Sequence, residues 1–228
     1  MNNKTECPGC GYENDLFRSN CTECGFLLRD KVPNIDLWST FWNIFYSPGE
    51  TFRRIIWSEH KNFLAVFIFF FSLKIYFDQI ILNRTVFKGN ASFGLLNLIF
   101  IILAVSVFAI IISVLFTKMS ALVKTNTRWK DNFAVIVYSQ LPLIISVLVI
   151  LPSAYALFGK YLVSTNPFAY ELKPLTAYFF LFLEAVCILW SFWLLFYSVL
   201  IQTGSKIIGI LVSLLFFAGT RFIAFFLC

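Results

Sequence analysis

Five long apolar runs constrain this chain more than any other feature of its sequence. They cover roughly residues 63–83, 93–117, 133–158, 177–201 and 207–227. Each run reaches the length of about 20 residues that a helix needs to cross the hydrocarbon core of a bilayer. Because lipid cannot satisfy free backbone polar groups, such runs cross membranes as helices. The sequence therefore predicts an all-α polytopic membrane protein with about five transmembrane helices.

Composition and charge agree with a membrane protein. Of all residues, 59% are hydrophobic and 13% are charged, whereas about a quarter of residues are charged in soluble domains. The net charge of +6 comes from lysines and arginines that lie mostly between the apolar runs. A nucleic-acid-binding protein gathers such residues on one soluble face, so we expect no nucleic-acid partner. We expect contact with membrane lipid headgroups instead.

The distribution of lysine and arginine predicts the orientation of the chain. The first 30 residues are polar, so we expect no cleavable signal peptide. With the N-terminus inside, twelve basic residues are cytoplasmic and four lie in outer loops, which agrees with the positive-inside rule. An odd number of spans then places the C-terminus outside the cytoplasm. The inner set is Lys4, Arg18, Arg29, Lys31, Arg53, Arg54, Lys61, Lys118, Lys124, Arg128, Lys130 and Lys206, and the outer set is Arg84, Lys88, Lys160 and Lys173.

Two C-x-x-C motifs mark residues 1–31 as a separate module. Cys7 and Cys10 form the first pair, Cys21 and Cys24 form the second, and a glycine follows each pair. Two thiolates at this spacing bind one metal ion from a tight turn, and two such turns complete a tetrahedral zinc site. The sequence therefore predicts a zinc ribbon that holds one structural zinc ion per chain.

A bound metal ion also explains how so short a module folds. About thirty residues are too few to build an adequate apolar core, so metal binding supplies most of the folding free energy. Two disulfides or an iron site are the alternatives, and a cytoplasmic location disfavours disulfides. Cys187 and Cys228 lie within apolar runs and are interpreted as inert packing residues.

Residues 32–62 form an amphipathic connector between the ribbon and the transmembrane bundle at 63–228. Ser47, Pro48 and Glu50 are typical of a helix start, with an N-cap serine, a first-turn proline and a capping-box glutamate. A helix is predicted to begin at Pro48. Such helices can lie in the plane of the lipid headgroups; the alternative is that they pack against the bundle. The apolar positions are Leu37, Phe41, Ile44 and Phe45, then Phe52, Ile55 and Ile56.

The connector motif and the five closely spaced helices together resemble a known family. The segment from Ser47 to Ile55, followed by five helices of which the third contains Pro142, is similar to the Yip-one domain family of Ypt-interacting membrane proteins. The resemblance covers residues 37–228. It implies a membrane protein with a cytoplasmic N-terminal region, which in eukaryotic members is associated with small Rab-type GTPases and vesicle traffic.

This chain departs from the eukaryotic pattern at its N-terminus. A zinc ribbon stands in place of the long N-terminal region, which puts a Rab-type partner in doubt. The ribbon and the bias towards Ile, Phe, Lys and Asn suggest a prokaryotic source. We therefore expect an inner or plasma membrane location.

Pro142 lies about ten residues into the third apolar run. A proline inside a helix removes a backbone hydrogen bond and kinks the helix. The kink could make room for a cavity. Alternatively it merely shapes the packing, because prolines are ordinary in membrane helices.

Four charged residues fall inside the predicted spans. Lys74 and Asp78 share a face of the first span, Glu184 lies in the fourth and Arg221 in the fifth. At about 1.5 Å per residue, all four lie roughly 16–22 Å above the inner edge of a hydrocarbon core of about 30 Å. Since unpaired charges at this depth are costly, we expect the four to face one another and neutralise. They would form a site for a lipid headgroup, a small solute or a proton, or else a structural latch. A third reading has Lys74 and Arg221 reaching to the outer interface.

Enzymatic activity is not expected from this sequence. His60 is the one histidine, and neither a metal-catalytic pair nor a nucleophile motif is present. The leading hypothesis is a membrane scaffold or adaptor that recruits a cytoplasmic protein partner through the ribbon and connector, in membrane organisation or trafficking. The alternative is a permease-like or lipid-handling protein that uses the buried charges. Homo-oligomerisation is left open.

Overall fold

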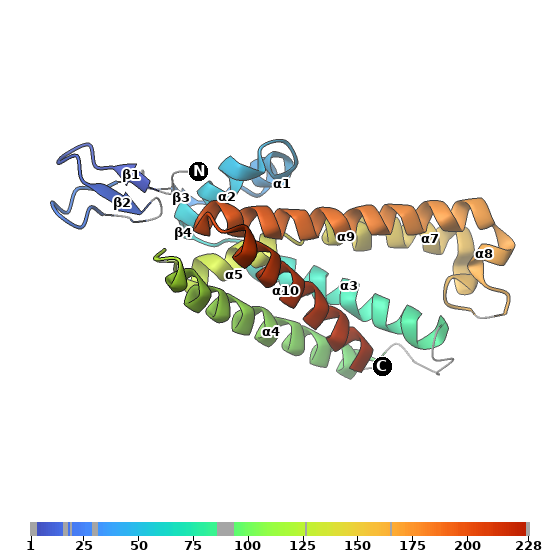
Figure 1. Ribbon diagram of the computed structural model, residues 1–228. Coiled ribbons are helices and arrows are strands. Elements are labelled where there is room, and N and C mark those ends of the chain that lie inside the picture. Colours follow the sequence, from blue (N-terminus) through green and yellow to red (C-terminus); the bar gives the residue numbers. More distant parts are fainter. Residues whose placement is uncertain are drawn as a thin grey trace. The chain divides into compact units, whose positions relative to one another are not determined.

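The computed structural model describes residues 4–15, 18, 20–28, 32–85, 94–125, 127–164 and 166–226. Over these residues five helical segments are long and apolar enough to cross a membrane (Figure 1), which confirms the predicted fold class. The spans are α3 (Leu64–Thr85), α4 (Leu95–Leu122), a composite segment over Leu141–Val163, α9 (Pro174–Thr203) and most of α10 (Lys206–Phe226).

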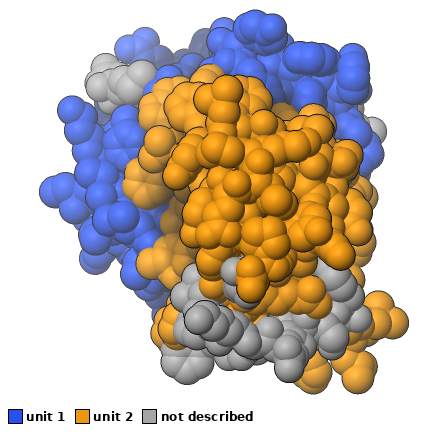
Figure 2. Space-filling model, turned by 90° about the vertical axis from the view of Figure 1, so that its right-hand side faces the viewer, with its two compact units in different colours: residues 1–64, 109–139, 194–215 blue, residues 65–108, 140–193, 216–228 orange. Residues whose placement is uncertain are grey.

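The chain divides into two compact units (Figure 2). The first contains residues 1–64, 109–139 and 194–215, and the second contains residues 65–108, 140–193 and 216–228. Helices α4, α9 and α10 contribute residues to both units.

The N-terminal module of the first unit is built from two short strands and two cysteine turns. Strand β1 (Lys4–Glu6) pairs antiparallel with β2 (Glu13–Asp15). Gly11 and Gly25 each follow the second cysteine of a pair and have φ angles of 72° and 71°. Glycine adopts this left-handed conformation without the steric cost of a Cβ. The glycines therefore let the chain leave each cysteine turn.

Two helices follow in the connector, and they meet at Ser47. Helix α1 spans Leu37–Tyr46 and is capped by Asp36, whose Oδ2 accepts from Ser39 N at 2.9 Å. Helix α2 spans Pro48–Trp57, so it begins at the predicted residue. The side chain of Ser47 does not cap α2 as predicted. Ser47 also ends α1, and its Oγ donates to Asn43 O at 3.5 Å.

The apolar face of α2 is covered by protein within the first unit. Phe52 and Ile55 are fully buried, and α2 contacts helix α5 (Trp129–Tyr138). A Cβ at Gly49 would lie 3.3 Å from the hydroxyl of Tyr197 on α9. Helix α2 therefore packs its apolar face against α5, as in the second of the two readings given for the connector, and does not present that face to lipid headgroups.

Lys61 joins the end of α2 to helix α5. Its Nζ donates to the backbone carbonyls of Ile55, Ile56 (2.9 Å) and Ser58 (3.0 Å). The same nitrogen lies 3.1 Å from Asp131 Oδ1, and both side chains are nearly buried. Cations near a helix C-terminus satisfy its free carbonyls and its dipole. Lys61 thus ends α2 and pairs it with α5.

Two further contacts hold the connector. Strand β3 (Val32–Asn34) pairs in parallel with β4 (Ser58–His60), so the two ends of the connector lie side by side. The buried Tyr138 donates its hydroxyl to Asn62 O at 2.6 Å. The chain therefore enters α3 from a fixed position in the first unit.

The third span differs from the predicted helix with a kink at Pro142. Helix α5 ends at Tyr138, and a new helix, α6 (Leu141–Ile145), begins with Pro142 in its first turn. A first-turn proline costs little, because its missing N–H would have no helical partner there. The span continues through a π-helix, η1 (Ser146–Ile150), then α7 (Leu151–Phe158) and the 3₁₀ segment η2 (Gly159–Val163). Pro142 therefore marks a boundary between helices.

Aromatic packing and close helix approach hold the second unit. Phe216 of α10 stacks on Phe71 of α3 and Phe108 of α4, with ring centroids 5.9 and 6.1 Å apart. A Cβ at Gly219 would lie 2.0 Å from Phe108, so the absence of a side chain lets α10 approach α4. Helix α8 (Ala169–Leu172) lies in the segment between η2 and α9.

Candidate functional site

The four N-terminal cysteines form one cluster. Their sulfur atoms all lie within 4.8 Å of one another, with Cys7 Sγ 3.5 Å from Cys24 Sγ and Cys10 Sγ 3.6 Å from Cys21 Sγ. These distances are far longer than a disulfide bond of about 2.05 Å. They are close to the sulfur separation of about 3.8 Å expected around a tetrahedral ion bound at about 2.3 Å. The cluster can therefore hold one four-coordinate metal ion.

Hydrogen bonds around Cys21 favour its thiolate form. The backbone N–H groups of Cys24 and Glu23 and the side-chain amide of Asn14 lower the pKa of Cys21 to about 6, against the opposing effect of burial. Asn14 Nδ2 lies 3.4 Å from the sulfur, and its Oδ1 accepts from Thr22 N at 3.0 Å. The buried Asn14 was not among the predicted site residues, because its role depends on how β2 folds back on the second cysteine turn.

The structure brings together the four charged residues of the predicted apolar runs, within the second unit. Lys74 Nζ lies 2.6 Å from Asp78 Oδ1 and 3.0 Å from Glu184 Oε2. Arg221 Nη1 lies 2.6 Å from Asp78 Oδ2. Ser146 of the π-helix donates to Glu184 Oε1 at 2.6 Å. These contacts connect five side chains in series, and we call them the charge network. In order, they are Arg221, Asp78, Lys74, Glu184 and Ser146.

The members of the charge network differ in how deeply their side chains are buried. The side chain of Lys74 is 6% exposed and its nitrogen lies between two carboxylates, so this lysine does not reach towards an interface. Asp78 and Glu184 are 19% and 23% exposed, and Arg221 is 38% exposed. The formal charges of the four sum to zero. Neutrality of this kind is what a low-dielectric environment requires of buried charges.

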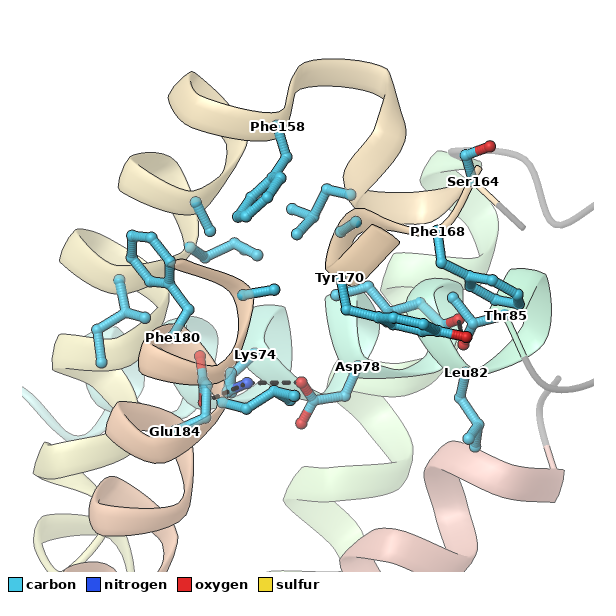
Figure 3. A pocket seen from close by; sticks show the side chains of 18 of the residues that line it. Lys74, Asp78, Leu82, Thr85, Phe158, Ser164, Phe168, Tyr170, Phe180 and Glu184 are labelled. Atoms are coloured by element: carbon cyan, nitrogen blue, oxygen red, sulfur yellow. Dashed lines mark hydrogen bonds and ion pairs between the residues drawn. The ribbon is translucent and has the colours of Figure 1, made fainter. Parts of the chain in front are cut away.

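A cavity of about 490 Å³ adjoins the charge network. All four charged residues line it, and its walls come from α3, η1, α7, η2, α8, α9 and α10 of the second unit. Figure 3 shows the nitrogen of Lys74 between the carboxylates of Asp78 and Glu184 on one side of the cavity, and Phe158 away from them. The cavity has the size of small-molecule sites, about 300–1,000 Å³. It combines apolar walls with a few charged groups.

The other predicted residues are not among those that line this cavity. Pro142 does not line it, which favours the reading in which the proline merely shapes the packing. Ser47, Pro48 and Glu50 belong to the first unit. Sequence reasoning missed Ser146, since no pattern distinguishes this serine from others in the apolar runs, and π-helices at functional sites are visible only in a structure.

Comparison with known proteins identifies one family. The family model for the Yip1 domain matches residues 42–227. No curated protein and no solved structure matches the chain. The matched range contains every member of the charge network and none of the four clustered cysteines.

The charge network predicts a non-additive response to neutralisation. Glu184→Gln alone should leave Lys74 and Arg221 with one carboxylate between them and lower the free energy of unfolding by about 2–5 kcal/mol. Arg221→Gln should cost less, because Arg221 is partly exposed. The double variant should be milder than the sum, since Lys74 and Asp78 remain as a neutral pair.

Detergent melting curves measure these effects. Lys206→Gln, which alters an exposed lysine of the first unit, is the matched control and should change stability by no more than about 0.5 kcal/mol. Strictly additive losses for Glu184→Gln and Arg221→Gln would show that the charges are not coupled.

Proposed function

The chain belongs to the Yip1 domain family, and we propose that it acts as an integral membrane adaptor in membrane organisation or trafficking. In this proposal the transmembrane bundle anchors the protein, and the N-terminal module and connector recruit a cytoplasmic protein partner. One observation carries the proposal: the cysteine cluster holds together a module outside the family-matched range that presents exposed apolar side chains. They are Tyr12, Phe26 and Leu27, which are 48%, 48% and 50% exposed.

Zinc is the metal that the cysteine cluster suits best. Four thiolates in two C-x-x-C turns are typical of structural zinc sites, which leave no open position for water. In residues 1–31 the metal would replace a hydrophobic core, and the three apolar side chains would then be free to face outwards. Contiguous exposed apolar surface is typical of interaction sites, and Phe26 and Leu27 are neighbours in the chain.

The geometry of Phe26 supports a fixed interaction surface. A Cβ at Gly9 would lie 3.2 Å from the Phe26 ring, so the ring rests on the first cysteine turn while nearly half of the residue is exposed. A bound metal ion would fix both turns and hence the position of the ring. A partner would therefore recognise the folded, metal-bound module.

Helix α1 of the connector is suited to the membrane surface. Trp38, Trp42 and Tyr46 repeat every four residues and are 67%, 46% and 80% exposed. Trp and Tyr are enriched at the membrane–water interface, where their rings lie at the level of the headgroups. We propose that α1 lies among the lipid headgroups, whereas α2 packs on α5. The interfacial connector at 32–62 would then hold the ribbon close to the bilayer.

The proposed orientation places the N-terminus in the cytoplasm and the C-terminus outside it, in a prokaryotic inner or plasma membrane. It is supported by the twelve-to-four division of lysine and arginine described above and by five candidate spans.

The cavity beside the charge network supports a second candidate function, the binding of a small ligand within the second unit. Charged groups at one side of an apolar cavity are what such sites use to orient a ligand. This function does not compete with recruitment of a partner by the first unit.

Zinc content tests the proposed metal site. Purified protein should contain one zinc ion per chain, and Cys10→Ser or Cys24→Ser should abolish stoichiometric zinc and unfold residues 1–31 while the membrane bundle stays assembled. Elemental analysis and limited proteolysis measure these results, with Cys187→Ser as the control. Absence of zinc, or recovery of iron or two disulfides, would contradict the proposal.

Reporter fusions test the orientation. A reporter active only in the cytoplasm should work when fused before residue 1 and fail when fused after residue 228, and a reporter active only outside should behave in the opposite way. Activity of both fusions on the same side would require an even number of spans and overturn the proposed topology.

Affinity purification in mild detergent tests recruitment. Phe26→Ser combined with Leu27→Ser should lose the co-purifying cytoplasmic protein by about tenfold or more, because the pair removes central apolar contacts. Glu23→Gln, an exposed neighbour, should retain it, and all three proteins should keep one zinc ion per chain. Equal recovery of partners by both variants would argue against the adaptor function.

A further inference from the structure

The cavity of the second unit carries its charged groups deep within the membrane spans. Asp78 lies seven residues before the end of α3 at Thr85, which corresponds to about 10 Å of helix. From the charge network the cavity extends past apolar residues towards Leu162 of η2 and Tyr170 of α8. A ligand in this cavity would therefore place its polar end on the network and its apolar part nearer the loop between the third and fourth spans.

The charge network retains binding capacity for both signs of charge. A guanidinium has five N–H donors, and Arg221 meets Asp78 through Nη1 while its side chain stays 38% exposed. An arginine in this situation suits a carboxylate, which it can bind in bidentate fashion. The oxygens of Asp78 and Glu184 each have two lone pairs, and both side chains are partly exposed, with Glu184 Oε2 itself buried. They suit an ammonium group.

Neutrality selects between charged and zwitterionic ligands. Because the network sums to zero, a ligand with a net charge would leave an uncompensated charge in a low-dielectric site. A ligand with one ammonium and one carboxylate group keeps the site neutral. Lys74, which is 6% exposed and lies between two carboxylates, holds Asp78 and Glu184 in place without being needed for the ligand.

The walls of the cavity suit an apolar and preferably aromatic group. Phe158 and Phe180 meet edge to face with ring centroids 6.4 Å apart. Phe168 and Tyr170 stack at 5.1 Å. Small side chains at Ala154 and Ala177 leave space between these rings. Aromatic rings favour edge-to-face and offset contacts with a further ring.

From these observations we propose that the cavity binds a free apolar α-amino acid, with its carboxylate on Arg221, its ammonium group on Asp78 and Glu184, and its side chain among the aromatic walls. This inference rests on the second candidate function and names its ligand class. A phospholipid in its bilayer orientation fits poorly, because its headgroup lies at the interface and its chains lie deeper. In this cavity the charged end is the deeper one.

Binding to the full chain in nanodiscs tests the proposal, with L-tryptophan as the probe and calorimetry as the measurement. Tryptamine lacks the carboxylate, indole-3-propionate lacks the ammonium group and L-serine lacks the apolar side chain. Each should bind at least about tenfold more weakly than L-tryptophan. Equal affinity for tryptamine or indole-3-propionate, or no binding of L-tryptophan, would overturn the assignment.

Matched variants locate the site. Arg221→Gln should weaken L-tryptophan binding about tenfold or more, and Arg221→Lys should weaken it less. Ala177→Leu should block binding by filling the cavity without altering a charge, whereas Val186→Leu, on the same helix but outside the cavity lining, should not. Unchanged affinity in Ala177→Leu, with the variant folded, would place the ligand elsewhere.

Competition with lysophosphatidylethanolamine tests the amino-acid assignment separately from the broader function, which is binding of some ligand in the cavity. This lipid carries an ammonium and an anionic group on an apolar chain, and it should not displace L-tryptophan. Displacement of L-tryptophan by this lipid, or binding of the lipid where L-tryptophan fails to bind, would overturn the amino-acid assignment while leaving ligand binding in the cavity intact. Failure of every probe would remove the second candidate function too, and the adaptor function would be unaffected.

Discussion

The four charged side chains that lie far from the ends of the membrane spans have to neutralise one another, because the bilayer offers no water to stabilise an isolated charge. Lys74 meets this requirement by lying between Asp78 and Glu184, and Asp78 in turn meets Arg221. These contacts join α3, α9 and α10 within the second unit. Apolar packing alone specifies weakly which helices meet in lipid, where the tails are as apolar as leucine. The charge network therefore fixes the arrangement around the cavity.

In the first unit, a cysteine cluster and polar contacts hold the structure in place of buried ion pairs within the membrane. Its N-terminal module is too small for an apolar core, and the four clustered sulfurs can bind a metal ion that takes the place of such a core. The connector is then fixed by polar contacts, of which Lys61 with Asp131 and Tyr138 with Asn62 are the clearest. Residues that usually fill a core are thereby left exposed, such as Phe26 on the module and Trp38 on α1. The proposed recruitment of a partner and the proposed binding of α1 at the membrane surface both depend on these exposed side chains.

Much of the fold could be predicted because lipid imposes a simple rule on length and polarity. Runs of about 20 apolar residues gave the five spans, and equal depth led us to expect the four charges to meet. The serine cap at Ser47 was not predictable, because this residue serves two helices whose junction is set by packing. Ser146 and Asn14 were missed for a similar reason. Ser146 lies 38 residues before its partner Glu184, and Asn14 lies 7 residues before its partner Cys21. The π-helix and the turn after β2 bring these pairs together, and neither feature is visible as a pattern in the sequence.

The ionisation of the two membrane carboxylates tests the charge network most directly. Infrared difference spectra of the chain in nanodiscs at neutral pH, with Asp78→Asn and Glu184→Gln as the subtracted variants, separate the bands of ionised and protonated carboxyl groups. Ion pairing predicts that each variant removes a band of an ionised carboxylate. Loss of a protonated carboxyl band in either variant would contradict a network of four charges that neutralise one another.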